Sequence, residues 1–303
     1  MSVAPSAALE VPREQALEEE APPPSIWRTL LTSVEGRVGL VLGALMLALI
    51  AFGRFFTPYK PTEIGTGPAA SGPSADHLLG TDHLGRDVLS RFLAGGDTIL
   101  LVPLIAVTLA FVAGGGLGML GGYLRGWADA VITRTFDLLL TLPPLLLVLV
   151  IIAGLGTSRL VLVLTVALVF LPRMGRVVRG ATQAVITNDY VAAAQARGER
   201  TSAIVVREVL PNIAAPAIAD FALRITYAII FVSTLNFLGL GAQPPKPDWG
   251  LMVAESRTFI AVAPWATLAP AFGIAALSIA FNFVADALTR HLTRETAKGV
   301  VPL

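Results

Sequence analysis

Residues 98–124 read TILLVPLIAVTLAFVAGGGLGMLGGYL, a run without a single charged side chain. An α-helix rises 1.5 Å per residue, so about 20 apolar residues cross the roughly 30 Å hydrocarbon core of a membrane. The run is long enough for that. Of the 303 residues of the chain, 54% are hydrophobic and only 14% are charged, whereas soluble domains carry about 25% charged residues. The sequence therefore predicts an all-α, polytopic membrane protein.

Five further apolar runs predict the other membrane helices. The shortest is flanked by Arg159 and Arg173, whose long side chains can carry their charges to opposite membrane surfaces. The runs cover residues 38–53, 138–158, 160–172, 225–245 and 258–285. We expect a bundle of about six transmembrane helices. Its parts are a first helix at 37–56, an extracytoplasmic loop with a short interfacial helix at 57–97, a transmembrane core at 98–290 and a tail at 291–303.

The positive charges predict the orientation. With the N-terminus inside, the inner segments hold 14 Lys and Arg residues and the outer ones hold 7, leaving Arg224 uncounted at the start of a span. Cytoplasmic loops are enriched in positive residues, so both termini are expected in the cytoplasm. Residues 1–36 are expected to form a disordered tail and a juxtamembrane segment rather than a secretory signal, because their charges are largely acidic and they lack an early apolar core.

Composition excludes several kinds of chemistry. The chain has no cysteine and therefore no disulfide, iron–sulfur cluster or thiolate zinc site. Its net charge of +1 gives no reason to expect a nucleic-acid partner. Each lysine precedes Pro or Gly, whereas a phosphate-binding P-loop needs Lys followed by Ser or Thr. Any ATP is therefore expected on another subunit.

A polar, helix-forming segment separates apolar runs at 172–224. Asn188 or Asp189 is suited to cap a first helix, and Gly198 is suited to end it in a left-handed conformation. Thr201 or Ser202 is expected to cap a second helix, which Pro211 would limit. A solvated connection is the alternative, but two caps and a turn glycine favour a structured docking element.

Part of this segment resembles the cytoplasmic loop of permease subunits of bacterial ABC importers. The matching residues are DYVAAAQARG at 189–198 and VLPN at 209–212. The family pattern is Glu-Ala-Ala, three residues, Gly, and then Leu-Pro about a dozen residues on. The resemblance implies a coupling helix, within a loop at 175–213, that docks on an ATP-hydrolysing subunit. The residues it points to are Asp189, Tyr190, Ala192, Ala193, Ala194, Arg197, Gly198, Arg200, Leu210 and Pro211. Because Ala192 stands where the family usually has Glu, docking is expected to depend on shape, Gly198 and arginines.

A second resemblance lies at residues 79–95, LGTDHLGRDVLSRFLAG, and is to the dipeptide, oligopeptide and nickel branch of these permeases. The residues predict a turn and then a short interfacial helix, with an apolar face opposite Arg86, Asp87 and Arg91. This helix either anchors the loop or contacts a docking partner. His77 and His83 are expected to be ordinary loop residues, so no metal site is predicted.

Two more segments follow the same branch. TLNFLGLGAQPPKPDWG at 234–250 resembles its Leu-Ser-Phe-Leu-Gly-Leu-Gly signature, with Asn236 in place of Ser. Its prolines predict a stiff outer turn that places Trp249 at headgroup depth. In RTFDLLLTLPPLLL at 134–147, Arg134 is expected to pair with Asp137. The candidates for an outer gate or a binding-protein contact are Gly80, Asp82, Gly85, Arg86, Asp87, Asn236, Gly239, Gly241 and Trp249.

The glycines at 116–121, GLGMLG, match the pattern of a dinucleotide-binding loop, but no strand precedes them. Gly114, Gly118 and Gly122 recur every four residues, which lets membrane helices approach closely. Helix packing is therefore the expected role of these glycines.

The resemblance implies a permease subunit of an ATP-driven, binding-protein-dependent importer in the bacterial inner membrane, similar to the C-type permease of peptide transporters and working by alternating access. Expected partners are a second homologous permease subunit, two ABC ATPase subunits holding ATP and Mg²⁺, an extracytoplasmic substrate-binding protein and the lipid bilayer. No catalytic residue or cofactor is expected in this chain. Peptides are the expected substrates, with nickel or another small solute as alternatives. An ion-coupled secondary transporter is a distant alternative, because the span interiors lack charge.

Overall fold

The computed structural model describes residues 30–299, with side chains over residues 30–290. Residues 1–29 and 300–303 lie outside the described residues, and so do most of the predicted N-terminal tail and the end of the predicted C-terminal tail. Within 30–299 the regular structure is helical, apart from one isolated β-bridge between Thr81 and Asp87. The prediction of an all-α protein is confirmed.

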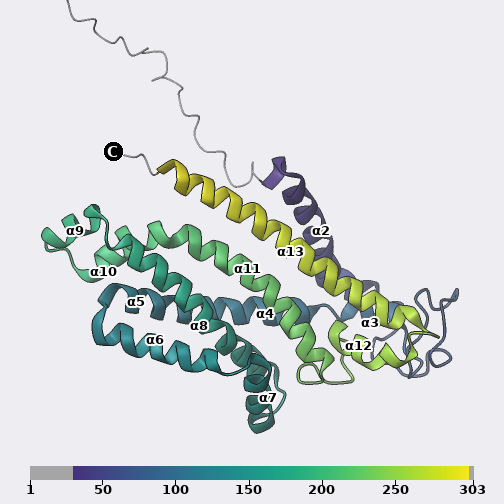
Figure 1. Cartoon of the computed structure of the whole chain (residues 1–303). Coiled ribbons are helices and arrows are strands. Elements are labelled where there is room, and N and C mark those ends of the chain that lie inside the picture. Colours follow the sequence, from purple (N-terminus) through teal and green to yellow (C-terminus); the bar gives the residue numbers. More distant parts are fainter. Residues whose placement is uncertain (1–29, 300–303) are drawn as a thin grey trace, which may run out of the picture.

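The elements form an elongated bundle (Figure 1). Helices α9 and α10 lie at one end, and the loop 57–87 lies at the other end with α3 and α12. In chain order the elements are α2 (Val34–Phe52), η2 (Gly53–Phe56), α3 (Val88–Ala94), α4 (Asp97–Ala110), η3 (Phe111–Gly115), α5 (Gly116–Leu124), α6 (Gly126–Thr141), α7 (Pro144–Leu155), α8 (Arg159–Val185), α9 (Asp189–Ala196), α10 (Thr201–Ile204), η4 (Val205–Val209), α11 (Leu210–Phe237), α12 (Trp249–Ser256), η5 (Arg257–Phe259) and α13 (Pro264–Gly299). Among the described residues, five helical segments are long and apolar enough to cross a membrane, and the bent pair α6–α7 would be a sixth.

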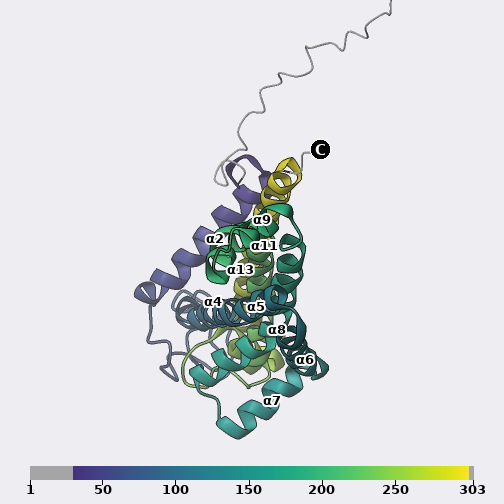
Figure 2. The same cartoon turned by 90° about the vertical axis from the view of Figure 1, so that its left-hand side faces the viewer.

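Helix α8 is the centre of the bundle. It packs against α4, α5, α6, α7 and α11, and Figure 2 shows it surrounded by them at the end of the molecule that carries α9. Val166 and Met174 of α8 are fully buried together with Ile229 of α11. The predicted short span at 160–172 is thus the first half of a 27-residue helix, which needs no snorkelling arginine to reach across a membrane.

The glycines of η3 and α5 pack against α8, as predicted. A β-carbon on Gly114 would lie 2.3 Å from the carbonyl oxygen of Leu171, and one on Gly118 would lie 2.1 Å from that of Gly175. Both distances are far inside van der Waals contact, so only glycine permits the two backbones to lie this close.

The predicted span at 138–158 is wrong as a single helix. The chain ends α6 at Thr141 and restarts as α7 at Pro144, with an angle of 88° between the two axes. Pro144 excludes helical geometry at Pro143, whose φ and ψ are −57° and 127°. Helix α7 has 12 residues and is about 18 Å long, too short to cross a bilayer alone.

Pro211 does not end a helix, contrary to the prediction. It lies in the first turn of α11, and the helical segment continues through it. The π-helical turn η4 immediately precedes it and keeps 201–237 continuous. With α8 reaching Val185 and α11 starting at Leu210, the irregular part of the predicted coupling loop is shorter than 175–213.

The two ends of the described chain meet along α13. Gly39 of α2 packs against Phe283 of α13, and the Arg290 guanidinium lies 3.5 Å from the Glu35 carboxylate. Helix α13 continues to Gly299, so the predicted tail at 291–303 begins as helix. That this side of the molecule faces the cytoplasm stays a prediction.

Candidate functional site

The segment predicted to dock on an ATPase lies at one tip of the molecule (Figures 1 and 2). Asp189 is the first residue of α9, and Asn188 precedes it in extended conformation. Gly198 follows the helix with φ of +73° and no atom within 4 Å of its would-be side chain. The predicted left-handed terminus at Gly198 is confirmed. The second helix starts at Thr201 itself, with Arg200 as the residue before it.

Helix α9 has one inner and one outer face. Val191 and Ala194 are fully buried with Ile204 of α10, and Tyr123 and Val185 pack against them. Ala192 and Ala193 are exposed, and Tyr190 is 40% exposed. The expectation that all three alanines form an outer surface is therefore wrong for Ala194, which joins α9 to the ends of α5 and α8.

The polar residues around α9 stay at the surface. The Arg197 guanidinium donates to the Glu199 carboxylate at 2.7 and 2.9 Å, so the two charges are paired at the surface. Arg200 is exposed, and Leu210 is exposed at the start of α11 beside Pro211. The structure thus brings the predicted residues to one tip, with Leu210 and Pro211 one π-helical turn behind α10.

The opposite end of the molecule carries a buried network of charges. The Arg86 guanidinium donates to Asp82 at 2.6 Å and to Glu255 at 2.8 Å, and Arg91 donates to Glu255 at 3.0 Å. Arg91 is 1% exposed and Asp82 is 3% exposed. Arg86, Asp87 and Arg91 are all buried, and that this helix lies at a membrane interface stays a prediction. Glu255 of α12 pairs with Arg86 and Arg91 from 169 and 164 residues away along the chain, and no local sequence pattern contains that partner.

His77 and Asp87 form the second buried pair of this region. The Nδ1 atom of His77 lies 2.9 Å from a carboxylate oxygen of Asp87, and its Nε2 atom lies 3.2 Å from the Thr66 carbonyl oxygen. Asp87 also caps α3 by accepting from the Ser90 backbone N–H at 2.8 Å. Gly80 and Gly85 both have positive φ and lie against loop backbone. These contacts fold the loop 57–87 onto α3.

The ligand-capable atoms of Asp82, His83 and Glu255 lie within 4.8 Å of one another. Both carboxylates already bind guanidinium groups of Arg86 and Arg91. The two guanidinium groups would repel a metal ion bound to the same carboxylate oxygens, so this cluster does not support a metal site.

Asn236 and Asp248 join the end of α11 to the start of α12. Asn236 donates to the Asp248 carboxylate at 3.0 Å and accepts from the Ala242 backbone N–H at 3.0 Å. Asp248 caps α12 by accepting from the Leu251 N–H at 3.1 Å. Burial raises the pKa of Asp248 to about 7, against the hydrogen bonds that favour its charged form. Gly241 lies directly against Asn236, and Gly239 has positive φ, so these candidates shape the turn.

Trp249 is buried inside the protein and does not face lipid headgroups. It is 0% exposed, its indole N–H donates to the Phe92 carbonyl oxygen at 2.8 Å, and its ring stacks on Phe92. Gly96 and Gly273 line the slot that receives the ring. The tryptophan therefore locks α12 to α3 and α13.

The predicted pair of Arg134 with Asp137 is also wrong. Asp137 of α6 pairs instead with Arg176 of α8, and Asp129 pairs with Arg179. These two bridges hold α6 along α8.

A helical bundle with several membrane-length segments and polar elements at both ends is a polytopic membrane protein. The chain belongs to the family of binding-protein-dependent transport system inner membrane components, whose model matches residues 114–298. It is therefore a multi-pass permease subunit of the inner membrane, and the family implies ATPase and substrate-binding partners.

Several curated proteins are similar over nearly the whole chain. A dipeptide transport system permease protein of Alkalihalophilus pseudofirmus is 36% identical, over 89% of this chain and 93% of the relative. A di/tripeptide transport system permease protein of Pseudomonas aeruginosa is 35% identical, over 91% and 93%. A glutathione transport system permease protein of Pectobacterium atrosepticum is 35% identical, over 86% and 87%.

Proposed function

We propose that this permease subunit imports short peptides. The support is that two of the similar relatives carry dipeptide or di/tripeptide transport in their names and the third carries glutathione, itself a tripeptide. The partners in this proposal are a second homologous permease subunit, two ATPase subunits and an extracytoplasmic binding protein. ATP and Mg²⁺ bind to the ATPases, and this chain needs no cofactor of its own.

The proposed contact with the ATPase is α9. The observation that carries this proposal is that α9 has one exposed and one buried face. Ala192 and Ala193 are exposed and free to contact a partner. Val191 and Ala194 are buried and pack against α5, α8 and α10. A force applied to the outer face passes to the membrane helices through that buried contact. Closure of the ATPase pair would then tilt the bundle and open the path outward.

Helices α3 and α12 and the loop 57–87 are the proposed outer side of the transporter. The Asp82, Arg86, Arg91 and Glu255 network ties loop to helix there, so the loop and α12 are expected to move as one unit. This end is the proposed landing side for the binding protein.

Replacing Gly198 with Val tests the docking role. A β-branched residue is strained at a φ of +73°, so the turn after α9 should change shape. We expect at least a tenfold loss of ATPase subunits co-purifying with a tagged chain, and a parallel loss of dipeptide uptake. Gly180→Val is the matched control, because Gly180 also has open space around it but no positive φ. Normal co-purification by Gly198→Val would refute docking through α9.

A transport assay separates the substrate alternatives. Cells or proteoliposomes carrying the whole transporter are expected to take up labelled di- and tripeptides on addition of ATP. Uptake of Ni²⁺ without uptake of peptides would refute the peptide assignment and leave the permease assignment intact.

A further inference from the structure

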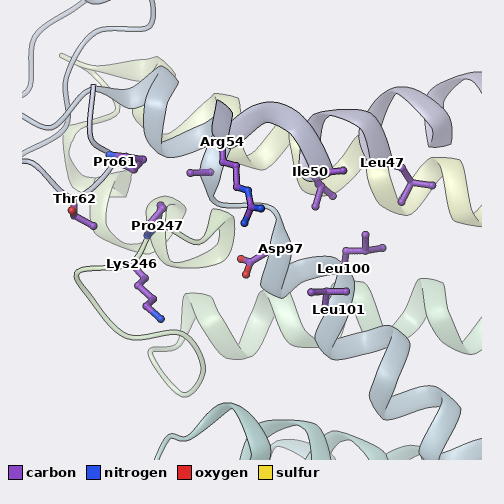
Figure 3. A pocket seen from close by; sticks show the side chains of 12 residues that line it. Leu47, Ile50, Arg54, Pro61, Thr62, Asp97, Leu100, Leu101, Lys246 and Pro247 are labelled. Atoms are coloured by element: carbon purple, nitrogen blue, oxygen red, sulfur yellow. The ribbon is translucent and has the colours of Figure 1, made fainter. Parts of the chain in front are cut away.

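A pocket of about 670 Å³ lies beside the outer end of α2, outside the contacts described above. It is bounded by α2, the start of α4 and the turn at 246–247 (Figure 3). Leu47, Ile50, Leu100 and Leu101 line one part of it, and Arg54, Asp97 and Lys246 line the other. The pocket therefore has an apolar half and a charged half.

The charged half lies where the apolar helices end. Arg54 directly follows the charge-free run 38–53, and Asp97 directly precedes the charge-free run 98–124. Leu47 and Ile50 lie one to two helical turns farther into α2, and Leu100 and Leu101 lie one turn farther into α4. The apolar half thus points toward the hydrocarbon core while the charged half lies at its surface.

The charges do not cancel within the protein. Asp97 forms an ion pair with Arg159, whose guanidinium lies 3.2 Å from the carboxylate. Over residues 30–290, no ion pair joins Arg54 or Lys246 to a carboxylate. Figure 3 shows the Arg54 side chain directed into the pocket and Lys246 across from it. Two cations are thus left without a counter-charge at the membrane surface.

We propose that this pocket binds one membrane phospholipid with an anionic headgroup. Its phosphate lies between Arg54 and Lys246, and an acyl chain lies along Leu47, Ile50, Leu100 and Leu101. A guanidinium binds phosphate oxygens through parallel N–H donors, and an ammonium adds a compact positive charge. A phosphodiester joined to an acyl chain matches both halves at once, whereas a second protein subunit would need a protruding side chain to fill a hollow of this size.

The proposal adds a lipid requirement to the permease. Helix α2 packs on the bundle mainly through α13, and the pocket opens between its end and the start of α4. A lipid bound in the pocket fills this space and holds α2 against α4 at the extracytoplasmic surface of the inner membrane.

The test is lipid retention by the whole transporter complex. The complex is delipidated in detergent and titrated with phosphatidylglycerol, and the lipids bound per complex are counted by native mass spectrometry. Each membrane-surface cation contributes about fivefold to binding of anionic lipid. We therefore expect Arg54→Gln with Lys246→Gln to weaken the tightest binding about 25-fold. Lys60→Gln with Arg257→Gln removes the same charge from the same side outside the pocket, and we expect less than a twofold change.

A second variant tests the apolar half without touching a charge. Ala51 lines the pocket and is exposed, so Ala51→Trp should fill the cavity and displace the lipid while the complex still assembles. Equal retention by wild type, the Arg54 and Lys246 double variant and Ala51→Trp would overturn the proposal. Competition by glycerophosphoglycerol, which has the headgroup but no acyl chain, would overturn the lipid assignment in favour of a simple phosphate site. Cross-linking of Ala51→Cys to another subunit would show a protein occupant and overturn it too.

Discussion

Asp248 is a buried carboxyl group between α11 and α12, at the end of the molecule opposite α9 (Figure 1). Its carboxyl is fully buried, and burial raises its pKa from 3.8 to about 7. Leu251 and Asn236 donate hydrogen bonds to it. These bonds lower the pKa but do not outweigh the loss of water around the charge.

The folded protein therefore binds the Asp248 proton more tightly than the unfolded chain does. Stability from this group is fully present below the unfolded pKa of about 4 and is lost as pH rises through about 7. A shift of this size corresponds to about 4 kcal/mol at alkaline pH, as an order of magnitude. We expect the melting temperature of the purified protein to fall between pH 5 and pH 8.

Asp248→Asn isolates this contribution. The amide oxygen of Asn still accepts from the Leu251 backbone N–H, and the amide cannot ionise. Its NH₂ group, however, would face the NH₂ group of Asn236, and neither can accept a hydrogen bond. The variant should be less stable than wild type at pH 5 and should recover relative to it at pH 8. Parallel melting curves for the two proteins across this range would contradict the shifted pKa.

Single residues also show where sequence reasoning stops. Gly198 was predictable because a left-handed helix end has a local signature. Trp249 was not, because its slot is built by Gly96 and Gly273 from other segments. Likewise Arg86 and Arg91 are exposed charges by pattern and buried ones in the structure, since Glu255 reaches them from α12.

At the scale of helices, the closest packing is that of α5 on α8. Gly118→Ala should separate these helices, because its β-carbon would overlap the Gly175 carbonyl oxygen. Overpacking of this kind costs about 1–3 kcal/mol, and we expect a lower melting temperature. Gly116→Ala is the matched control: no atom lies within 4 Å of its β-carbon, and alanine favours helix by up to about 1 kcal/mol. Equal destabilisation by both changes would contradict the packing argument.

Helix positions followed from apolar runs, but helix continuity did not. The four-residue glycine spacing and the run at 98–124 were enough to predict a packed membrane helix. The break at Pro143 comes from the restriction that Pro144 places on the residue before it. The helix through Pro211 stays continuous after the π-helical turn η4. Proline thus interrupts the helix at one place and is accommodated within it at the other.

Across the whole molecule, the two polar ends are joined by α8 and α11. Each helix runs from the tip near α9 toward the opposite end of the molecule (Figure 1), and each packs on the other. The inner face of α9 packs against α10 and the ends of α5 and α8, and η4 also contacts it. A displacement of α9 therefore moves long, packed helices rather than a loose loop.

Neighbouring alanines separate contact from transmission over that distance. Ala194→Leu enlarges a fully buried side chain and should push α9 off Val185 and Tyr123, with a cost of about 1–3 kcal/mol. We expect ATPase subunits still to bind, but with ATP-driven uptake reduced at least tenfold. Ala193→Leu enlarges an exposed side chain. The free energy of unfolding should then stay within about 0.5 kcal/mol of wild type, while ATPase binding falls. If both variants lost binding equally and neither changed stability, the inner face of α9 would have no role in transmitting motion, and the force would have to pass through the loop backbone alone.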